Sequence, residues 1–349
     1  MSKPYVTALI DTYNHERFIA EAIESVLAQD FPSSEMEILV VDDGSTDRTP
    51  EIIRSYGDRV RHIRKENGGQ ASALNLGFAE ARGEIVAMLD GDDVWLPHKI
   101  RRVTTEFERS PDIAVVYHPH DVWVHGSNLL EKDRSFYPVY GRMPLEGMAL
   151  LRYGDYGTSE ISLRRTLAAA MFPIPEGLWI YADSFLVFLA VFAGDVAGVP
   201  EALTRYRCHD ANLASFTGRD ERKLKRRWEC FAAAVAAAKQ WLVRHGQDLT
   251  RPDVAAFVRR HELVGRMLRF YWDPPGRSEY FRYLRGLHEL YRPLWTWRYR
   301  TFHNLLAVAG FALGYETSMA LRDRYRRSRL SVRTREGLFP VHAQRAVLW

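Results

Sequence analysis

The sequence has few cysteines and no segment that resembles a membrane span or a signal peptide. Its two cysteines, Cys208 and Cys230, lie far from any second cysteine or paired histidine, which excludes a zinc pattern and a disulfide framework and predicts a reducing compartment. The apolar run near the N-terminus is broken by Asp11, so it lacks the hydrophobic region of a signal peptide. The longest apolar stretch, residues 302–321, is interrupted by polar residues, and its core is too short to cross a bilayer. We therefore expect a cytoplasmic protein without a membrane span.

Two phosphate-binding signatures are also missing. The first predicted strand is followed by Asp-Thr-Tyr-Asn and not by G-x-G-x-x-G, which disfavours a dinucleotide-dependent dehydrogenase. The P-loop signature G-x-x-x-x-G-K-[ST] does not occur either. The composition, 46% hydrophobic and 26% charged, is that of a folded globular protein.

The charge is distributed unevenly along the 349 residues. Residues 219–349 contain 27 Lys and Arg against 12 Asp and Glu, a local charge of +15, although the whole chain carries only +4. The remainder, residues 1–218, therefore carries −11. At this length two domains are expected, and we place the boundary at residue 218, between an acidic domain (1–218) and a mostly helical basic region (219–349).

Strand and helix patterns alternate in the first third of the chain. Apolar runs typical of buried strands lie at residues 6–10, 37–41, 60–64 and 84–89. Between and after them are helical patterns: an apolar face from Ile19 to Leu27 in a helix opened by Asn14 or His15, cap-type residues in STDRTPEII, and runs at 70–82 and 97–109. This alternation predicts an α/β fold with a mostly parallel, doubly wound sheet flanked by helices.

Beyond residue 113 the pattern is looser. Two short strand candidates, IAVVYH and DVWVH, precede helices near 144–153, 164–171 and 181–193, and residues from 219 onward form a mostly helical extension. Polar segments follow the first four strands: DTYN, DDGSTD, ENGGQ and LDGDD. Because ligands of open parallel sheets bind beyond the carboxyl ends of the strands, we expect these four segments to meet at one edge.

The segment LDGDDVW places three carboxylates within four positions. Residues i and i+2 of an extended chain point the same way, so Asp90 and Asp92 share a direction and Asp93 turns away. Crowded carboxylates repel unless a cation offsets their charge, and Mg²⁺ or Mn²⁺ held by one or two carboxylates plus substrate phosphates fits this arrangement. The alternative is an acidic helix N-terminus ahead of Pro97, which explains Asp93 equally well; for the trio we favour a metal.

The other two loops are compatible with a nucleotide. An Asx turn explains the end of DDGSTD but does not require Asp42 and Asp43 side by side, and a carboxylate there can accept a hydrogen bond from a base or a ribose. In ENGGQ the paired glycines allow close backbone approach, and the N-terminus of the next helix favours a phosphate. A metal beside a nucleotide, without either phosphate-loop signature, indicates nucleotide-sugar chemistry.

The chain resembles a known family in four segments: VTALIDTYNHERFIAEAIESVLAQ, VVDDGSTD, ENGGQASALNLGFAEARGEIVAMLDGDD and YRCHDANLAS. In this order and spacing they resemble family 2 of the inverting glycosyltransferases, which have the GT-A fold, over residues 5–215. The resemblance implies a nucleotide pocket lined by Asp11, Tyr13 and Asn14, a base contact from Asp43, Asn67 and Gln70 near the nucleotide, and a D-x-D of Asp90 and Asp92 for the ribose and the metal-bridged diphosphate.

Two further site residues follow from the resemblance. The acceptor-side base of the family usually lies in a Glu-Asp pair that opens a helix, and the corresponding segment WIYADSFLVFLAV provides Asp183, preceded here by Ala182. Helix capping is the alternative role for Asp183. A histidine in the position of His209 approaches the metal or the diphosphate in the family, whereas a structural pairing with Asp210 is the alternative.

The resemblance implies a metal-dependent enzyme that transfers one sugar by a single inverting displacement. The expected donor is a nucleoside-diphosphate sugar, first of all a UDP-sugar, and the acceptor a saccharide or a lipid-linked acceptor of cell-surface polysaccharide or glycoconjugate synthesis. Leu224 replaces the Gln of the processive Q-x-x-R-W motif, so we expect a non-processive enzyme. The alternatives are a sugar-nucleotide pyrophosphorylase, which would need a Gly-rich basic loop after the first strand, and a non-catalytic nucleotide-sugar or carbohydrate-binding protein of the same fold.

The basic C-terminal region combines arginines with aromatics, as in RPLWTWRYRTFHNLLAVAGFALGY and RDRYRRSRLSVR. Three interpretations remain open: a helical cap with solvated arginines, a homodimer interface, or a peripheral contact with the anionic inner face of the membrane. No nucleic-acid-binding motif accompanies the charge, so a nucleic-acid partner is not expected.

Overall fold

The computed structural model describes residues 4–124, 130–132, 140–141, 156–209, 212, 221–291, 304–305, 307–308, 310–317 and 319–320. The chain divides into two compact units, one of residues 1–143 and 153–217 and one of residues 144–152 and 218–349. Each unit has an apolar cluster of its own. The helix predicted near 144–153 lies outside the described residues.

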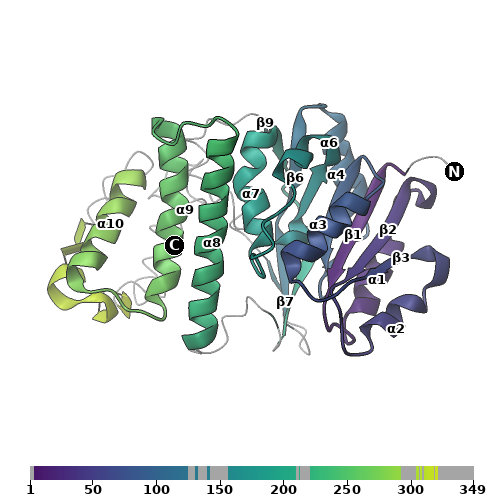
Figure 1. The fold of residues 1–349 in the computed structure, drawn as a ribbon, viewed down its shortest axis with the longest axis horizontal. Coiled ribbons are helices and arrows are strands. Elements are labelled where there is room, and N and C mark those ends of the chain that lie inside the picture. Colours follow the sequence, from purple (N-terminus) through teal and green to yellow (C-terminus); the bar gives the residue numbers. More distant parts are fainter. Residues whose placement is uncertain are drawn as a thin grey trace. The chain divides into compact units, whose positions relative to one another are not determined.

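The first unit contains an eight-stranded sheet in the order β3-β2-β1-β4-β10-β6-β11-β9 (Figure 1). Its strands are β1 (Val6–Thr12), β2 (Met36–Asp42), β3 (Arg61–Arg64), β4 (Ile85–Asp90), β6 (Ile113–Tyr117), β9 (Tyr140–Gly141), β10 (Ile161–Arg164) and β11 (Asp195–Gly198). The first four strands are parallel, whereas β10 runs antiparallel to both β4 and β6. The predicted α/β fold with a mostly parallel sheet is confirmed. The antiparallel strand β10 was not predicted, because its four residues show no clear strand pattern.

Helices cover both faces of this sheet (Figure 1). They are α1 (Ile19–Leu27), α2 (Thr49–Arg54), α3 (Gln70–Glu80), α4 (Lys99–Glu108), α6 (Arg165–Ala168) and α7 (Ala182–Ala193). Alternate residues of a strand point to opposite faces: Ile10 belongs to the cluster that includes α1, α2 and α4. Leu9 instead meets Gly77 of α3, where an added Cβ would lie 2.3 Å from Leu9 Cδ1. Helix α3 therefore packs so closely on β1 at this glycine that a larger residue would displace the Leu9 side chain.

Helix α1 begins later than its sequence predicts. Asn14 has a left-handed backbone (φ 56°), and its side-chain oxygen accepts a hydrogen bond from the Thr46 N–H, so it cannot cap the helix. The carbonyl of His15 accepts hydrogen bonds from the N–H groups of Phe18 and Ile19, forming a turn before the helix. The loop after β1 is thus tied to the loop after β2, and the helix starts only at Ile19.

A second, four-stranded sheet in the order β5-β12-β7-β8 joins distant parts of the first unit. Its strands are β5 (Val94–Trp95), β7 (His120–Val124), β8 (Leu130–Lys132) and β12 (Thr204–Cys208). Strand β12 pairs antiparallel with β5 and parallel with β7. The pairing with β5 brings the end of β12 beside the turn that follows β4.

The second unit is helical in its described part. Its helices are α8 (Glu221–Arg244), α9 (Pro252–Phe270) and α10 (Arg277–Tyr291), and the described residues between 304 and 313 are also helical. Aromatic residues of α9 and α10 form its core, with Phe270 in edge contact with Tyr283 at 5.1 Å between ring centroids. Within the residues that the structure describes, no helix is both long and apolar enough to cross a membrane.

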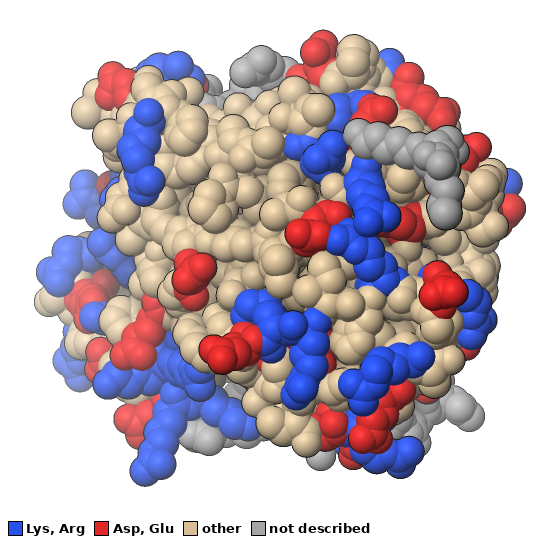
Figure 2. Space-filling view, turned by 45° about the vertical axis from the view of Figure 1, so that its right-hand side comes forward, with Lys and Arg blue, Asp and Glu red and all other residues tan. Residues whose placement is uncertain are grey.

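Charged side chains are mixed on the face shown in Figure 2, where Lys and Arg lie among Asp and Glu. Some of the basic side chains of α8 to α10 have acidic partners: Lys239 pairs with Glu262 and Arg259 with Glu289, each at 2.7 Å. The arginine-rich residues beyond 320 lie outside the described residues.

Candidate active site

The four polar segments predicted to meet do so at the carboxyl edge of the parallel strands. Asp11 near the end of β1 is in register with Asp90 at the end of β4, and the Gly91 N–H donates to the Asp11 carbonyl at 2.9 Å. The Asp43 N–H donates to the Thr12 carbonyl at 2.9 Å. Adjacent parallel strands thus carry their terminal carboxylates to one place.

Asp11, which is buried, and Asp90, which is partly buried, form a crowded pair. Burial, and after it the charge of Asp92, raise the pKa of Asp11 to about 8. Burial and the charges of Asp11 and Asp92 also hold the pKa of Asp90 well above its usual range. Asp11 Oδ1 is buried without a hydrogen-bond partner, which leaves an acceptor that a ligand hydroxyl or N–H group can satisfy.

Asp92 is paired with histidines instead. His209 Nε2 lies 2.9 Å from Asp92 Oδ2, Asn212 Nδ2 lies 3.3 Å from the same oxygen, and His15 Nε2 lies 3.8 Å from it. Burial alone would raise the pKa of Asp92, but His15 and the hydrogen bond to His209 outweigh it and lower the pKa. The loop after β12 and the turn after β4 therefore meet at a carboxylate that stays ionised.

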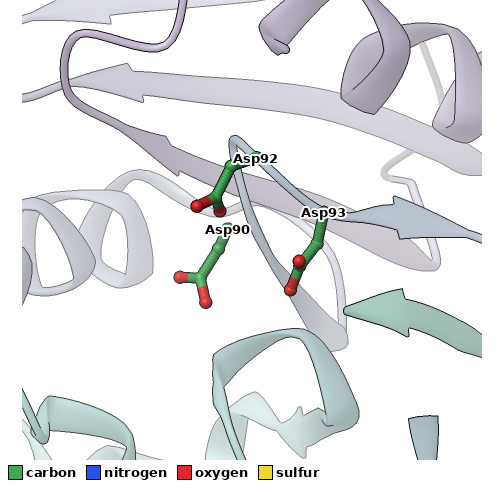
Figure 3. A group of neighbouring side chains, drawn as sticks. All are labelled: Asp90, Asp92 and Asp93. Atoms are coloured by element: carbon green, nitrogen blue, oxygen red, sulfur yellow. The ribbon is translucent and has the colours of Figure 1, made fainter. Parts of the chain in front are cut away.

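The carboxylates of Asp90, Asp92 and Asp93 can each place an oxygen within 4.8 Å of the others. Figure 3 shows Asp90 and Asp92 on the same side of the turn and Asp93 apart from them. The oxygens of Asp93 already accept hydrogen bonds from the Ser159 hydroxyl at 2.6 Å and from the Arg207 N–H at 2.8 Å. The oxygen and imidazole donors of Asp90, Asp92 and His209 suit a divalent cation, whereas Asp93 has a structural role.

Asp43 organises the loop after β3. Its carboxylate accepts hydrogen bonds from Lys65 Nζ at 2.7 Å and from the N–H groups of Gly68 at 3.0 Å and Gly69 at 2.7 Å. Asn67, between these partners, is exposed. The two glycines are therefore held by the loop after β2, at the start of α3.

Gln70 bridges this loop to the rest of the site. Its side-chain amide nitrogen lies 3.3 Å from Asp90 Oδ1 and 2.9 Å from Thr158 Oγ1. Tyr13, predicted to line the nucleotide pocket, is 43% exposed. Its neighbour Asn14 ties two loops together through the Ser45 hydroxyl at 2.9 Å and the Thr46 N–H at 2.8 Å.

Asp183 lies in the first turn of α7. The helix begins after Tyr181, a residue with a left-handed backbone (φ 67°), so Asp183 is not the N-cap residue. Its Oδ1 accepts the Ser184 N–H at 2.6 Å. Burial, and to a smaller extent the charge of Glu160, raise the pKa of Asp183 to about 6. A carboxylate with such a pKa is ionised at neutral pH and basic enough to accept a proton.

Two buried groups make contacts that the sequence did not indicate. Arg207 is fully buried, with Nε donating to the Asp92 carbonyl at 2.7 Å and its guanidinium lying over the rings of Phe18 and Trp123. Phe18 in turn contacts the His209 ring at 4.4 Å between centroids. The only signal for Arg207 was its place two residues before His209.

The second group surrounds Glu160, which is 1% exposed. Glu160 Oε2 accepts the Gly157 N–H at 2.5 Å, and His120 Nδ1 lies 3.4 Å from Oε1. Buried Lys99 donates from Nζ to the Ser159 carbonyl at 2.6 Å. No sequence motif contains these residues, because their proximity depends on β7, α4 and the segment before β10.

Residues 7–145 match the family described as Glycosyl transferase family 2. An uncharacterised glycosyltransferase of Nostoc sp. is 36% identical over 233 residues, which are 62% of this chain and 70% of the relative. An uncharacterised protein of Mycobacterium tuberculosis is 30% identical over 285 residues, 76% of this chain and 75% of the relative.

Among solved structures, residues 1–349 of S. aureus TarS in complex with UDP-GlcNAc have a TM-score of 0.61 and 18% identity, covering 82% of this chain and 80% of TarS 1–349. At this identity the similarity shows that the two proteins share the fold.

Proposed function

The chain belongs to family 2 of the glycosyltransferases, and from this premise we propose that it transfers one sugar from a nucleoside-diphosphate sugar to an acceptor hydroxyl, with inversion at the anomeric carbon. The observation that carries the proposal is the meeting of Asp11, Asp90, Asp92 and His209 at one edge of the sheet. TarS was solved with UDP-GlcNAc, and we take a UDP-sugar as the first donor to test. Cys208 and Cys230 are thiols and not a disulfide, which agrees with a reaction in the cytoplasm.

The donor nucleotide is held by the loops after β1, β2 and β3. The unpaired Oδ1 of Asp11 is an acceptor for a base N–H or a ribose hydroxyl. The exposed ring of Tyr13 offers a stacking face for the base. Asp43 acts on the donor mainly by holding Gly68 and Gly69 in place, because its oxygens are already used by their N–H groups and by Lys65. Asn67 and Gln70 complete the edge of this nucleotide pocket.

The diphosphate lies next to Asp90, Asp92 and His209. These residues would hold Mn²⁺ or Mg²⁺, which when bound supplies positive charge against the diphosphate leaving group. Arg207 fixes the main chain of Asp92, and Phe18 fixes the ring of His209. The chain's own part in departure of the diphosphate is therefore to keep these groups in one geometry.

Asp183 acts on the acceptor. Its carboxylate takes the proton of the acceptor hydroxyl as the oxygen forms a bond to the anomeric carbon, and the bonding pair of the breaking C–O bond leaves with the nucleoside diphosphate. Glu160, the carboxylate on the other side of Gly157, is 1% exposed, and its Oε2 accepts the Gly157 N–H. Because Glu160 is buried and already accepts this hydrogen bond, Asp183 is the better candidate for the base. A single displacement of this kind inverts the anomeric centre and adds one sugar per encounter.

The donor half of the proposal is tested by thermal stabilisation with a panel of UDP- and GDP-sugars, with and without Mn²⁺. We expect a rise in melting temperature with a nucleotide sugar plus metal, and its loss in Asp92→Asn, whose own melting temperature stays close to that of the wild type. Equal stabilisation of Asp92→Asn, or of the wild type stripped of metal, would contradict the metal site.

The acceptor half is tested with Asp183→Asn. This variant should keep the donor affinity of the wild type and lose at least about a hundredfold in turnover, because a general base acts on the acceptor and not on the donor. Asp112→Asn, which changes an exposed aspartate that is not a site residue, is the matched control. Loss of donor binding in Asp183→Asn would indicate a structural role, and full turnover would exclude Asp183 as the base.

A further inference from the structure

A helix of the second unit exposes large apolar side chains. The described residues between 304 and 313 are helical, and four of them form what we call the apolar strip: Leu305, Val308, Phe311 and Leu313, which are 64, 62, 52 and 56% exposed. Residues three apart on a helix lie next to one another, so the first three continue along one side. Single exposed apolar residues are ordinary, but a contiguous set marks a surface that binds something.

The strip borders the side of the helix that packs on the second unit, because Phe311 makes an edge contact with Phe281 of α10 at 5.6 Å between ring centroids. Ala307 and Tyr315 pack against the apolar cluster of α9 and α10, and Gly310 is buried. Tyr315 makes an edge contact with Phe270 at 5.8 Å between ring centroids. Packing on α10 accounts for Phe311 in part, but it does not explain why Leu305, Val308 and Leu313 are each more than half exposed.

The sequence around this helix is basic and aromatic. Residues 322–335 contain seven arginines and one acidic residue, and residues 292–300 contain three arginines, two tryptophans and no acidic residue. In α8 to α10, by contrast, acidic partners neutralise several of the basic side chains, as in the pairs Lys239–Glu262 and Arg259–Glu289. An apolar segment flanked in the sequence by clustered arginines and tryptophans is the combination that binds the interface of an anionic bilayer.

A second copy of the chain is a poorer occupant. Residues 219–349 carry a charge of +15, and a dimer formed through the strip would bring two such regions together, so that like charges oppose the contact. An anionic lipid surface gains from the same charge.

We propose that the apolar strip docks the protein on an anionic lipid bilayer. Leu305, Val308, Phe311 and Leu313 enter the boundary between headgroups and acyl chains, and the positive charge of the sequence that precedes and follows this helix favours an anionic surface. This docking does not depend on the sugar-transfer chemistry. It would keep the enzyme at the surface where lipid-linked acceptors lie.

The test is co-sedimentation of the full chain with vesicles of phosphatidylcholine alone and of phosphatidylcholine with phosphatidylglycerol, at low and high salt. The variant Leu305→Glu/Val308→Glu changes two exposed side chains of the strip. Val243→Glu, at a 58% exposed valine of α8, is the matched control. Equal melting temperatures and circular dichroism spectra establish that all three proteins are folded.

We expect the wild type and Val243→Glu to pellet with phosphatidylglycerol vesicles and to be released by salt. The double variant should bind at least about tenfold more weakly, since it loses apolar side chains and adds negative charge facing an anionic surface. Binding of the double variant equal to that of the wild type, or no preference of the wild type for phosphatidylglycerol, would overturn the proposal. A wild-type dimer that the double variant converts to monomer, seen by light scattering, would assign the strip to a second copy instead.

Discussion

Removing the charge of Glu160 should change the acidity of Asp183 without touching Asp183 itself. A Cβ added to Gly157 would lie 3.0 Å from Glu160 Oε2 and 3.8 Å from Asp183 Oδ2, so Gly157 lies between the two carboxylates. Their oxygens are therefore no more than about 6.8 Å apart. Glu160→Gln keeps an oxygen that can accept the Gly157 N–H and removes only the negative charge.

The size of the effect follows from this separation. Two unit charges about 6.8 Å apart interact with about 0.6 kcal/mol in water and about 2.4 kcal/mol at an effective dielectric constant of about 20. Since about 1.4 kcal/mol corresponds to one pH unit, the midpoint for Asp183 should fall by about 1 pH unit. The pKa of Asp183 is about 6 and burial is its larger cause, so the variant's pKa stays above the ordinary value of an aspartate.

The sign can be read from the acid limb of the pH–rate profile. Asp183 accepts a proton only when ionised, so activity is lost as the pH falls through its pKa. The charge of Glu160 favours the neutral form, and its removal should shift the limb to lower pH. The assay is hydrolysis or transfer of a UDP-sugar between pH 4.5 and 8, with Glu35→Gln, an exposed glutamate before β2, as the control.

An acid limb of Glu160→Gln that coincides with that of the wild type would refute the electrostatic coupling. This outcome is distinct from a failure of the base assignment, because that assignment rests on the loss of turnover in Asp183→Asn. Other groups face Glu160 as well: His120 from β7 and Lys99 from α4 both lower its pKa. His120→Gln should therefore leave Glu160 ionised but without the ion pair to His120 that helps to position its side chain.

Two further predictions concern residues that hold the site together. Arg207→Met should lower the free energy of unfolding by about 3 kcal/mol and weaken donor binding, and Arg207→Lys should restore part of both. Urea denaturation measures the stability and donor titration the binding. Wild-type values in Arg207→Met would contradict the role of Arg207. Gly69→Ala should cost about 1–3 kcal/mol, because Gly69 has φ 84° and a Cβ would lie 2.9 Å from the Trp179 ring. Gly246→Ala, also left-handed (φ 73°) but with no atom within 4 Å of the added Cβ, separates strain from contact; equal losses in both variants would exclude the Trp179 contact.

The fold of the first unit was largely predictable because its strands are short, apolar and separated by helices with clear apolar faces. Strands β1, β2 and β4 and helices α1, α3 and α4 lie at their predicted places to within a few residues, apart from the later start of α1. Strand β10 was not predicted, since ISLR has too few residues to show a period. Strand β5 was also missed, because two residues become a strand only when β12 pairs with them.

The domain boundary and the roles of the site residues remain predictions. The expected convergence of segments did occur, because the carboxyl ends of parallel strands must share an edge. The sequence could not show which distant residues contact each site side chain. Ser159, Arg207 and His120 reach the site from strands or turns whose positions depend on the whole sheet.

The three aspartates of LDGDD illustrate this limit. They are the same residue type within four positions, and spacing alone separates only Asp93 from the other two. Their chemistry diverges through partners far along the chain. Asp93 has both oxygens filled by Ser159 and Arg207, Asp92 stays ionised beside His209 and His15, and Asp90 is crowded by Asp11.

This division has a physical cause. Three ionised carboxylates in one buried turn would repel one another strongly. Imidazoles face Asp92, whereas burial and neighbouring charges hold the pKa of both Asp90 and Asp93 well above the usual range. The oxygens of Asp93 already accept short hydrogen bonds from Ser159 and Arg207, so Asp90 is the carboxyl at which a bound cation can still remove repulsion. The end of β4 is therefore where the proposed metal and diphosphate would gain most from binding.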